Sequence, residues 1–464
     1  MNQLCKFIQM KKISLIFLLG ALLLPSCEDL VEVNAPTNQL GSVQVFEDVQ
    51  TANATLAGLY ASLRDQSVIS GAGYYAASTL AASYADDLDC YNNDQNGAMD
   101  IYRNQQQETN MMIANVWNTA YKQIYYANSI IYGAENSLSL SEADKNRLKG
   151  EALLVRSLLY FYLQQLWGDI PYTTSLDYEY NRSLIKTGSA ALLEKVELDL
   201  KQAIPLLEDN YRNSQRIFPN RKVAELVLAR VYLNQQKYQQ AEQLATGILQ
   251  SPLYQFQSNL NEVFHKTGSH ILWQLSPQNS GDATKEASFY YFSGAAPNAY
   301  TLTPALVNSF TDGDLRKQAW MTKVSFNGSS WYRPYKYKNL SGTNTNEYSV
   351  VFRLEEVYFI LAEALAKQNR LNEAMPYLNA TRERAGLSTL TSLSAESFIN
   401  ELLAEKRREF FSEFGHRFFD LKRLGRLNEL KTLKPNWEDF KSLWPLPQNE
   451  LLLNTNLAPQ NPGY

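Results

Sequence analysis

The sequence predicts a mainly α-helical protein, in which pairs of helices stack on one another and carry a loop-rich region. Three observations support this fold class: long segments with apolar residues at helical spacing, two segments that resemble each other (224–244 and 357–377), and a stretch from about 251 to 350 that is rich in turn residues. The chain has 464 residues, of which 45% are hydrophobic and 19% charged, so it can bury a large core.

The overall composition excludes several classes of function. The formal net charge is only −4 and no long basic run is present, so we expect no nucleic-acid partner. Three histidines and three cysteines are too few for the common multi-ligand zinc sites or a disulfide framework. We therefore expect no metal site and no cofactor.

The first residues have the pattern of a secretory signal peptide. Lys11 and Lys12 precede an apolar run at 13–24, which is too short to cross a bilayer core of roughly 30 Å. A signal peptide over 1–26 is the interpretation we favour, and an uncleaved membrane anchor is the alternative. Met10 would also make a typical start, so the initiator is either Met1 or Met10.

The end of this segment resembles the lipobox of bacterial lipoproteins. The residues Leu24-Pro25-Ser26-Cys27 place a small residue directly before a cysteine, which implies cleavage before Cys27 and lipidation of its thiol. The polar stretch at 27–41 then reads as a tether, and 42–464 as the folded domain.

Five segments show helical spacing of apolar residues. They are 51–64, 110–135, 141–167, 224–244 and 357–377. Ser141 predicts the N-cap of the third helix, whose second half is apolar almost all round and should therefore be central. A short apolar run at 271–275, which contains Trp273, predicts a buried strand.

The two similar segments each predict a helix, a tight turn and a second helix. Their spacing resembles the tetratricopeptide repeat, in which one helix pair cannot bury its apolar face and several pairs must stack. The residues that match the consensus are Leu228, Ala229, Tyr232, Tyr238 and Ala241. The small residues, Ala229 and Ala241 in one segment and Ala362 and Ala374 in the other, let the two helices of a pair approach closely.

The C-terminal third carries the densest recognisable motif. Residues 405–425 read EKRREFFSEFGHRFFDLKRLG, and 444–447 and 461–464 read WPLP and NPGY. Together with the central helix, which ends in Gly168-Asp169-Ile170-Pro171, these motifs resemble the SusD/RagB family of outer-membrane lipoproteins. The resemblance covers most of the chain and is weak at about 70–100 and 255–350.

The resemblance implies a function and a partner. Members of this family sit on the cell surface, cap a SusC-like TonB-dependent outer-membrane transporter, and bind its nutrient without cleaving it. We therefore expect a lipid-anchored, cell-surface glycan-binding protein of the outer membrane that delivers oligosaccharides to such a transporter, and not an enzyme. The alternative is a RagB-like peptide-binding lipoprotein of the same import system.

The candidate ligand-binding residues lie in the two weakly matching regions. A sugar ring has an apolar face on which tyrosine stacks and a polar rim to which asparagine and aspartate bond. The residues that offer this mixture are Tyr91, Asn92, Asn93, Asp94, Tyr290, Tyr291, Asn298 and Tyr300. For any single ring, burial in the core is the competing interpretation.

Three other interpretations stay open at this point. A surface hydrolase could use Glu413 and His416, although the alternation of charges and phenylalanines there favours a structural role. A calcium site could form in the acidic cluster, whose spacing lacks a calcium-loop pattern and whose members are Asp86, Asp87, Asp89 and Asp94, with Asn92 and Asn93. A third possibility is a purely structural partner that seats the transporter without touching ligand.

Overall fold

The computed structural model describes residues 44–92 and 97–464. The predicted signal peptide, the tether and Cys27 lie outside the described residues. The chain divides into two units at Val45, and the second unit, Phe46–Tyr464, contains every α-helix and strand discussed below. None of the helices in these ranges is long and apolar enough to cross a membrane.

The N-terminal half is almost entirely helical. Its elements are α2 (Val49–Asp65), α3 (Ala77–Tyr84), β1 (Leu88–Cys90), α4 (Ala98–Tyr102), α5 (Met111–Asn136), α6 (Glu142–Trp167), α7 (Tyr178–Asn181), α8 (Ser189–Leu206), α9 (Arg221–Asn234) and α10 (Tyr238–Leu249). Short 3-10 turns occur here and later, at Gln44–Phe46, Leu260–Glu262, Leu427–Thr432, Asp439–Ser442 and Thr455–Leu457.

The second half alternates short strands with helices and then returns to helical pairs. Its elements are β2 (Ile271–Leu275), α11 (Lys285–Phe289), β3 (Tyr300–Leu302), α12 (Pro304–Asn308), α13 (Leu315–Ala319), β4 (Met321–Phe326), β5 (Ser329–Pro334), β6 (Ser349–Arg353), α14 (Leu354–Lys367), α15 (Leu371–Arg384), α16 (Ala395–Phe410), α17 (His416–Arg423) and α18 (Gln448–Leu453).

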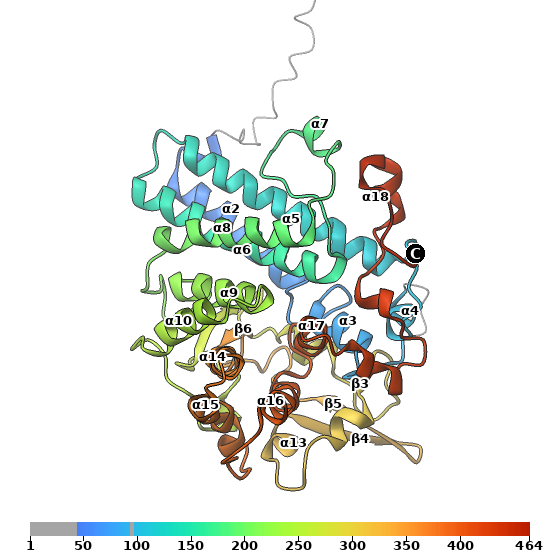
Figure 1. Ribbon diagram of the computed structural model, residues 1–464. Helices are drawn as coiled ribbons and strands as arrows, with labels where there is room; N and C mark the ends of the chain where they lie inside the picture. The colour runs from blue at the N-terminus through green and yellow to red at the C-terminus, as the bar shows by residue number, and fades with distance from the viewer. Residues whose placement is uncertain (1–43, 93–96) are drawn as a thin grey trace, which may run out of the picture. The chain divides into compact units, whose positions relative to one another are not determined.

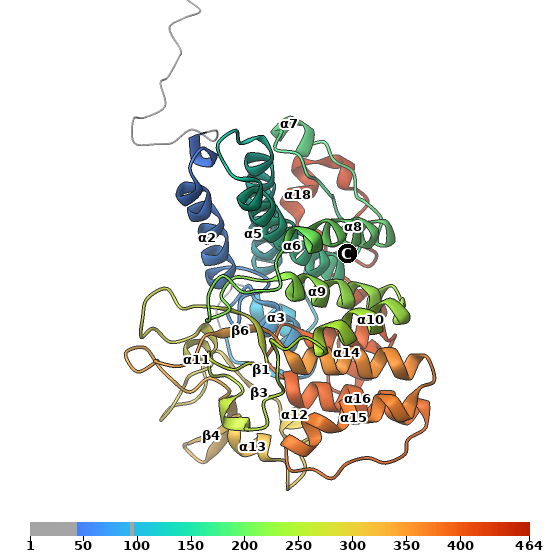
Figure 2. The ribbon, with the colours of Figure 1, turned by 90° about the vertical axis from the view of Figure 1, so that its left-hand side faces the viewer.

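The helices stack as consecutive antiparallel neighbours. Helix α5 packs on α6, α6 on α8, α8 on α9, α9 on α10, α10 on α14 and α14 on α15, and Figures 1 and 2 show this series of layers. The prediction of a mainly helical, tetratricopeptide-like stack is therefore confirmed. Ala229 and Ala241 in one helix pair, and Ala362 and Ala374 in the other, are all fully buried, so no larger side chain separates the paired helices.

Helix α6 is the centre of the stack. The Oγ of Ser141 caps it by accepting a hydrogen bond from the backbone N–H of Asp144 at 3.1 Å. Every residue from Gly150 to Trp167 is buried, as its nearly continuous apolar sequence predicts. Gly168, with φ of 75°, ends the helix in a conformation that a residue with a Cβ adopts at a cost.

The region at 251–350 supplies most of a small sheet. The strand order is β1-β3-β5-β4, all antiparallel, and a separate two-stranded sheet pairs β2 with β6. Trp273 on β2 is fully buried, so the predicted buried strand is confirmed. Figures 1 and 2 both place β3 and β4 low in the molecule and α7 and α18 at its upper end.

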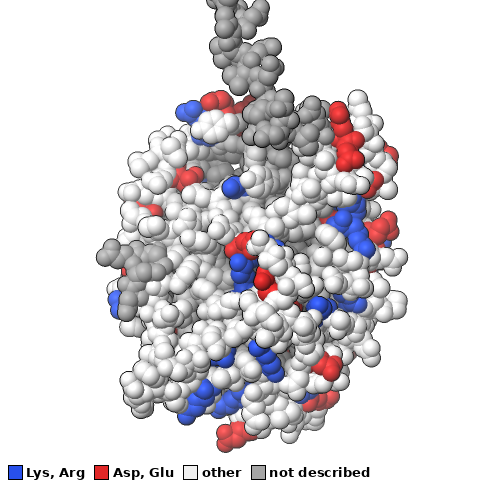
Figure 3. Space-filling view, turned by 180° about the vertical axis from the view of Figure 1, so that it is seen from behind, with Lys and Arg blue, Asp and Glu red and all other residues white. Residues whose placement is uncertain are grey.

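Charged side chains of both signs are scattered over the surface. In the view of Figure 3, patches of lysine and arginine and patches of aspartate and glutamate lie apart on a largely uncharged surface, and several of the cationic patches lie in its lower part.

The C-terminal motif forms a buried network of ion pairs. Arg353 bonds to Glu409 at 2.5 Å and to Glu413 at 3.1 Å, and Lys336 bonds to Glu413 at 2.5 Å. His416 is buried and stacks on Phe410 with ring centroids 4.3 Å apart. Burial lowers the pKa of His416 well below its ordinary value. The motif is therefore a structural element of the core, as the alternation of charges and aromatic rings predicts.

Glu286 is a buried carboxyl group that should give stability a measurable pH dependence. Its Oε2 accepts a hydrogen bond from Ser349 Oγ at 2.7 Å, and burial raises its pKa from 4.5 to about 7. The folded protein thus holds a proton that the unfolded chain releases near its ordinary pKa, so this group makes folding less favourable as pH rises from about 4.5 to 7.

We therefore expect the Glu286→Gln variant to be the more stable protein at pH 8, by roughly 1–3 kcal/mol, and to match the wild type near pH 4.5. Urea unfolding followed by circular dichroism across this pH range measures the difference. Parallel curves for the two proteins at all pH values would show that Glu286 ionises normally in the fold.

Candidate functional site

A group of aromatic side chains lies at the end of strand β1 in the four-stranded sheet. The backbone N–H of Tyr91 donates to the carbonyl of Ala299 at 2.7 Å, which continues the pairing of β1 with β3. On β5, the indole Nε1–H of Trp331 donates to the hydroxyl of Tyr91 at 3.1 Å, and the two rings meet edge to face with centroids 6.5 Å apart. Tyr91 and Trp331, which are far apart in the sequence, are thus in direct contact.

A second aromatic group adjoins it through Arg333. Trp331 and Arg333 are two residues apart on β5 and therefore project from the same face of the sheet. The guanidinium of Arg333 lies 5.0 Å from the ring centre of Tyr291 and 5.1 Å from that of Tyr335. Burial lowers the pKa of Arg333, and the flat cation lies against both rings. We call Tyr91, Tyr291, Trp331, Arg333 and Tyr335 the aromatic face.

The structure places the predicted site residues in three different environments. Tyr91 is half-buried, Tyr291 is 43% exposed, and Asn298 is exposed in the loop that leads into β3. Asn92 is buried next to Tyr91. Asn93 and Asp94 lie outside the described residues.

The prediction for Tyr290 and Tyr300 is wrong. Tyr290 is 2% exposed and its hydroxyl hydrogen-bonds to Thr79 Oγ1 at 2.9 Å, while Tyr300 is 1% exposed on β3 and packs against Phe289. Burial raises the pKa of both phenols. These two rings fill the core beneath the sheet, so they have no surface to offer a ligand.

Sequence reasoning missed Trp331, Arg333 and Tyr335. The segment at 329–335 reads SSWYRPY, and its alternation on a strand would have placed Trp331, Arg333 and Tyr335 on one side. That signal does not say which side faces solvent, because this depends on the pairing of β5 with β3 and β4.

Two aspartates of the acidic cluster pair with arginine side chains and do not surround a metal ion. Asp86 bonds to Arg417 at 2.9 Å, and Asp87 bonds to Arg407 at 2.7 Å. Burial alone would raise the pKa of Asp86, but the guanidinium of Arg407 and that of Arg417 outweigh it and lower the pKa. Within 44–92 and 97–464, no group of three or more histidine, cysteine or acidic residues is placed to hold a metal.

The chemistry of the aromatic face is that of binding. Flat rings attract the C–H faces of a sugar, and the hydroxyl of Tyr91, which accepts from Trp331, can still donate a hydrogen bond to its rim. The carboxylate of Glu413, which the hydrolase hypothesis invokes, is instead held by Lys336 and Arg353 in the core. A helical-repeat scaffold that presents such a face is typical of a ligand-binding protein.

Comparison with known proteins identifies the family. A family model described as "Starch-binding associating with outer membrane" matches residues 36–233, and the model of the SusD family matches residues 308–464. The resemblance to the SusD/RagB family is therefore confirmed over 36–233 and 308–464.

Relatives align over nearly the full length. SusD-like protein P2 of Formosa agariphila is 27% identical, and the alignment covers 98% of this chain and all of that protein. A SusD superfamily structure from Bacteroides thetaiotaomicron superposes with a TM-score of 0.76 at 24% identity, over 89% of this chain and 99% of that one. Surface glycan-binding protein A from the same organism, in complex with laminarihexaose, superposes with a TM-score of 0.75 at 18% identity, again over 89% and 99%.

Proposed function

We propose that this protein is a cell-surface binding protein that captures a neutral oligosaccharide on its aromatic face. The observation that carries the proposal is the shared face of Trp331 and Arg333 on β5, where Trp331 contacts Tyr91 and Arg333 contacts Tyr291 and Tyr335. Aromatic rings with hydroxyl groups at their margin match the apolar face and polar rim of a pyranose.

The family supports both the ligand class and the destination. One matching family description names starch binding and association with the outer membrane, and a structural neighbour was solved with laminarihexaose. We propose that Cys27 carries the lipid that holds the protein on the outer membrane, and that a SusC-like TonB-dependent transporter receives the oligosaccharide.

Purification from the native membrane tests the lipid anchor and the transporter partner, and affinity gels test the ligand class. When the full-length chain is extracted from its native membrane in mild detergent, we expect an acylated cysteine at position 27 by mass spectrometry and a TonB-dependent barrel that co-purifies with it. On affinity gels that contain neutral polysaccharides, such as laminarin and starch, we expect the protein to be retarded by at least one of them.

Each part of the proposal would be refuted by a specific result. A mature protein without acyl groups would refute the anchor, and the absence of a barrel would refute the delivery role. Retention on immobilised peptides, with free migration through every polysaccharide, would refute glycan capture and select the peptide-binding alternative.

A further inference from the structure

A cavity lies at the end of the described unit away from the aromatic face. It has a volume of about 810 Å³ and is enclosed by α5, by the loop at 171–184 that contains α7, and by α18 with the turn after it. Ligand pockets in proteins span roughly 300–1,000 Å³, so the cavity has room for a small ligand. It shares no lining residue with the aromatic face, and Figures 1 and 2 place α7 and α18 at the end away from β3 and β4.

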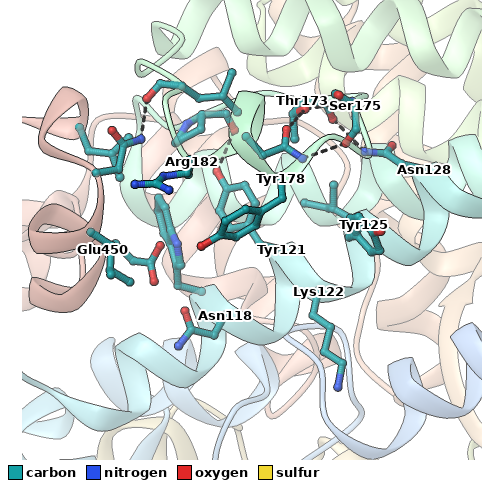
Figure 4. A pocket seen from close by; sticks show the side chains of 18 of the residues that line it. Asn118, Tyr121, Lys122, Tyr125, Asn128, Thr173, Ser175, Tyr178, Arg182 and Glu450 are labelled. Carbon is teal, nitrogen blue, oxygen red and sulfur yellow. Dashed lines mark hydrogen bonds between the residues drawn. The ribbon is translucent and has the colours of Figure 1, made fainter. Parts of the chain in front are cut away.

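Four aromatic residues line this cavity. Trp117 and Tyr121 form its inner wall, with ring centroids 4.8 Å apart. Tyr178 on α7 is 72% exposed and Tyr125 on α5 is 44% exposed, although both rings line a concave surface. Figure 4 shows the rings of Tyr121 and Tyr178 in the middle of the cavity and Tyr125 at one side. Exposed rings in a hollow give an incoming ligand flat apolar area.

The wall that carries Tyr178 is held in place by hydrogen bonds. Thr173 Oγ1 donates to Asn181 Oδ1 at 2.6 Å, and Asn181 Nδ2 donates to the carbonyl of Ser175 at 3.0 Å. Asn128 on α5 donates to the carbonyl of Thr173 at 3.1 Å, and Tyr121 donates to that of Pro171 at 2.7 Å. The loop is thus fastened to α5, and the cavity is formed before any ligand arrives.

The polar groups at the margin balance one another in charge. Lys122 and Arg182 contribute cations, of which Arg182 pairs with Glu179 at 3.3 Å, and Glu450 on α18 contributes a carboxyl whose pKa is raised by burial. Figure 4 shows Arg182 and Glu450 on the side opposite Tyr125, with Asn118 below them. Asn118 is exposed and its side chain makes no hydrogen bond to any described residue. Such a margin favours a neutral ligand with many hydroxyl groups over a strongly charged one.

We propose that this cavity is a second saccharide-binding site, in which the C–H face of a sugar stacks on Tyr178 and Tyr125 while Asn118, Arg182 and Glu450 bond to its hydroxyl groups. The occupant is a neutral oligosaccharide of a few units. The proposal stands on the cavity itself, so it does not require the aromatic face to bind.

The test measures binding of the full-length chain to an array of neutral oligosaccharides, including laminarihexaose, beside an array of short peptides. The background is the double variant Trp331→Ala/Tyr291→Ala, which disables the aromatic face. We expect this protein to keep binding at least one oligosaccharide, and we expect Tyr178→Ala to weaken that remaining binding roughly five- to tenfold. Tyr180→Ala is the matched control, because Tyr180 is an exposed tyrosine of α7 that does not line the cavity.

The outcomes separate the two sites. No remaining oligosaccharide binding in the double variant, no effect of Tyr178→Ala, an equal effect of Tyr180→Ala, or binding of peptides alone would overturn the second site. Binding that is untouched by the double variant but lost with Tyr178→Ala would establish the second site and refute the aromatic face. Tyr178 is on the surface, so its replacement leaves the core intact.

Discussion

Replacement of Glu409 by alanine is expected to lower the free energy of unfolding by about 3–5 kcal/mol. Three buried arginines share this carboxylate: Arg353 and Arg384 at 2.5 Å each, and Arg316 at 3.3 Å. Burial alone would raise the pKa of Glu409, but the guanidinium groups of Arg384 and Arg353 outweigh it and hold the pKa well below its ordinary value. Without the carboxylate, three cations remain in the core with too few partners.

Equilibrium urea unfolding at pH 7 measures this loss. Asp439→Asn is the control, because Asp439 pairs with Lys431 at 3.1 Å on the surface and its removal should cost less than about 1 kcal/mol. If Glu409→Ala were no more destabilising than Asp439→Asn, the buried network would not be what holds the C-terminal motif to α13, β6 and α15.

The helical stack was predictable because its signal is local and repeated. Apolar spacing over 141–167 and the paired alanines of α9–α10 and α14–α15 determine which faces are buried, with no need to know the partner helix. The short strands around 300–334 carry little local signal, since three to six residues pair with segments that are distant in sequence.

The candidate site was predictable only in part for the same reason. Tyr290 and Tyr291 are neighbours in the sequence, yet Tyr290 closes helix α11 against Thr79 in the core while Tyr291 packs on Arg333 at the surface. The amino-acid sequence alone does not show which of two adjacent tyrosines is buried and which is exposed. The cavity around Tyr178 was missed because its walls come from 117–128, 171–184 and 450–457.

Removal of two rings from the aromatic face is expected to weaken oligosaccharide binding strongly. Each aromatic contact contributes roughly 0.5–1.5 kcal/mol, so removal of two rings predicts roughly 5- to 150-fold weaker binding of the oligosaccharide at this face. The double variant Trp331→Ala/Tyr291→Ala removes the ring that bonds to Tyr91 and the ring that rests on Arg333. Phe326→Ala is a suitable control, because Phe326 is a partly exposed aromatic residue on β4 of the same sheet and lies outside the aromatic face.

The most direct measurement is isothermal titration calorimetry. It compares the wild type, the double variant and Phe326→Ala, each titrated with the neutral oligosaccharide that the wild type binds most tightly. The account predicts that the double variant loses the high-affinity phase of the titration while Phe326→Ala keeps it, with all three proteins unfolding at similar temperatures. An unchanged titration in a folded double variant would contradict the assignment of the aromatic face as the place where sugar is captured.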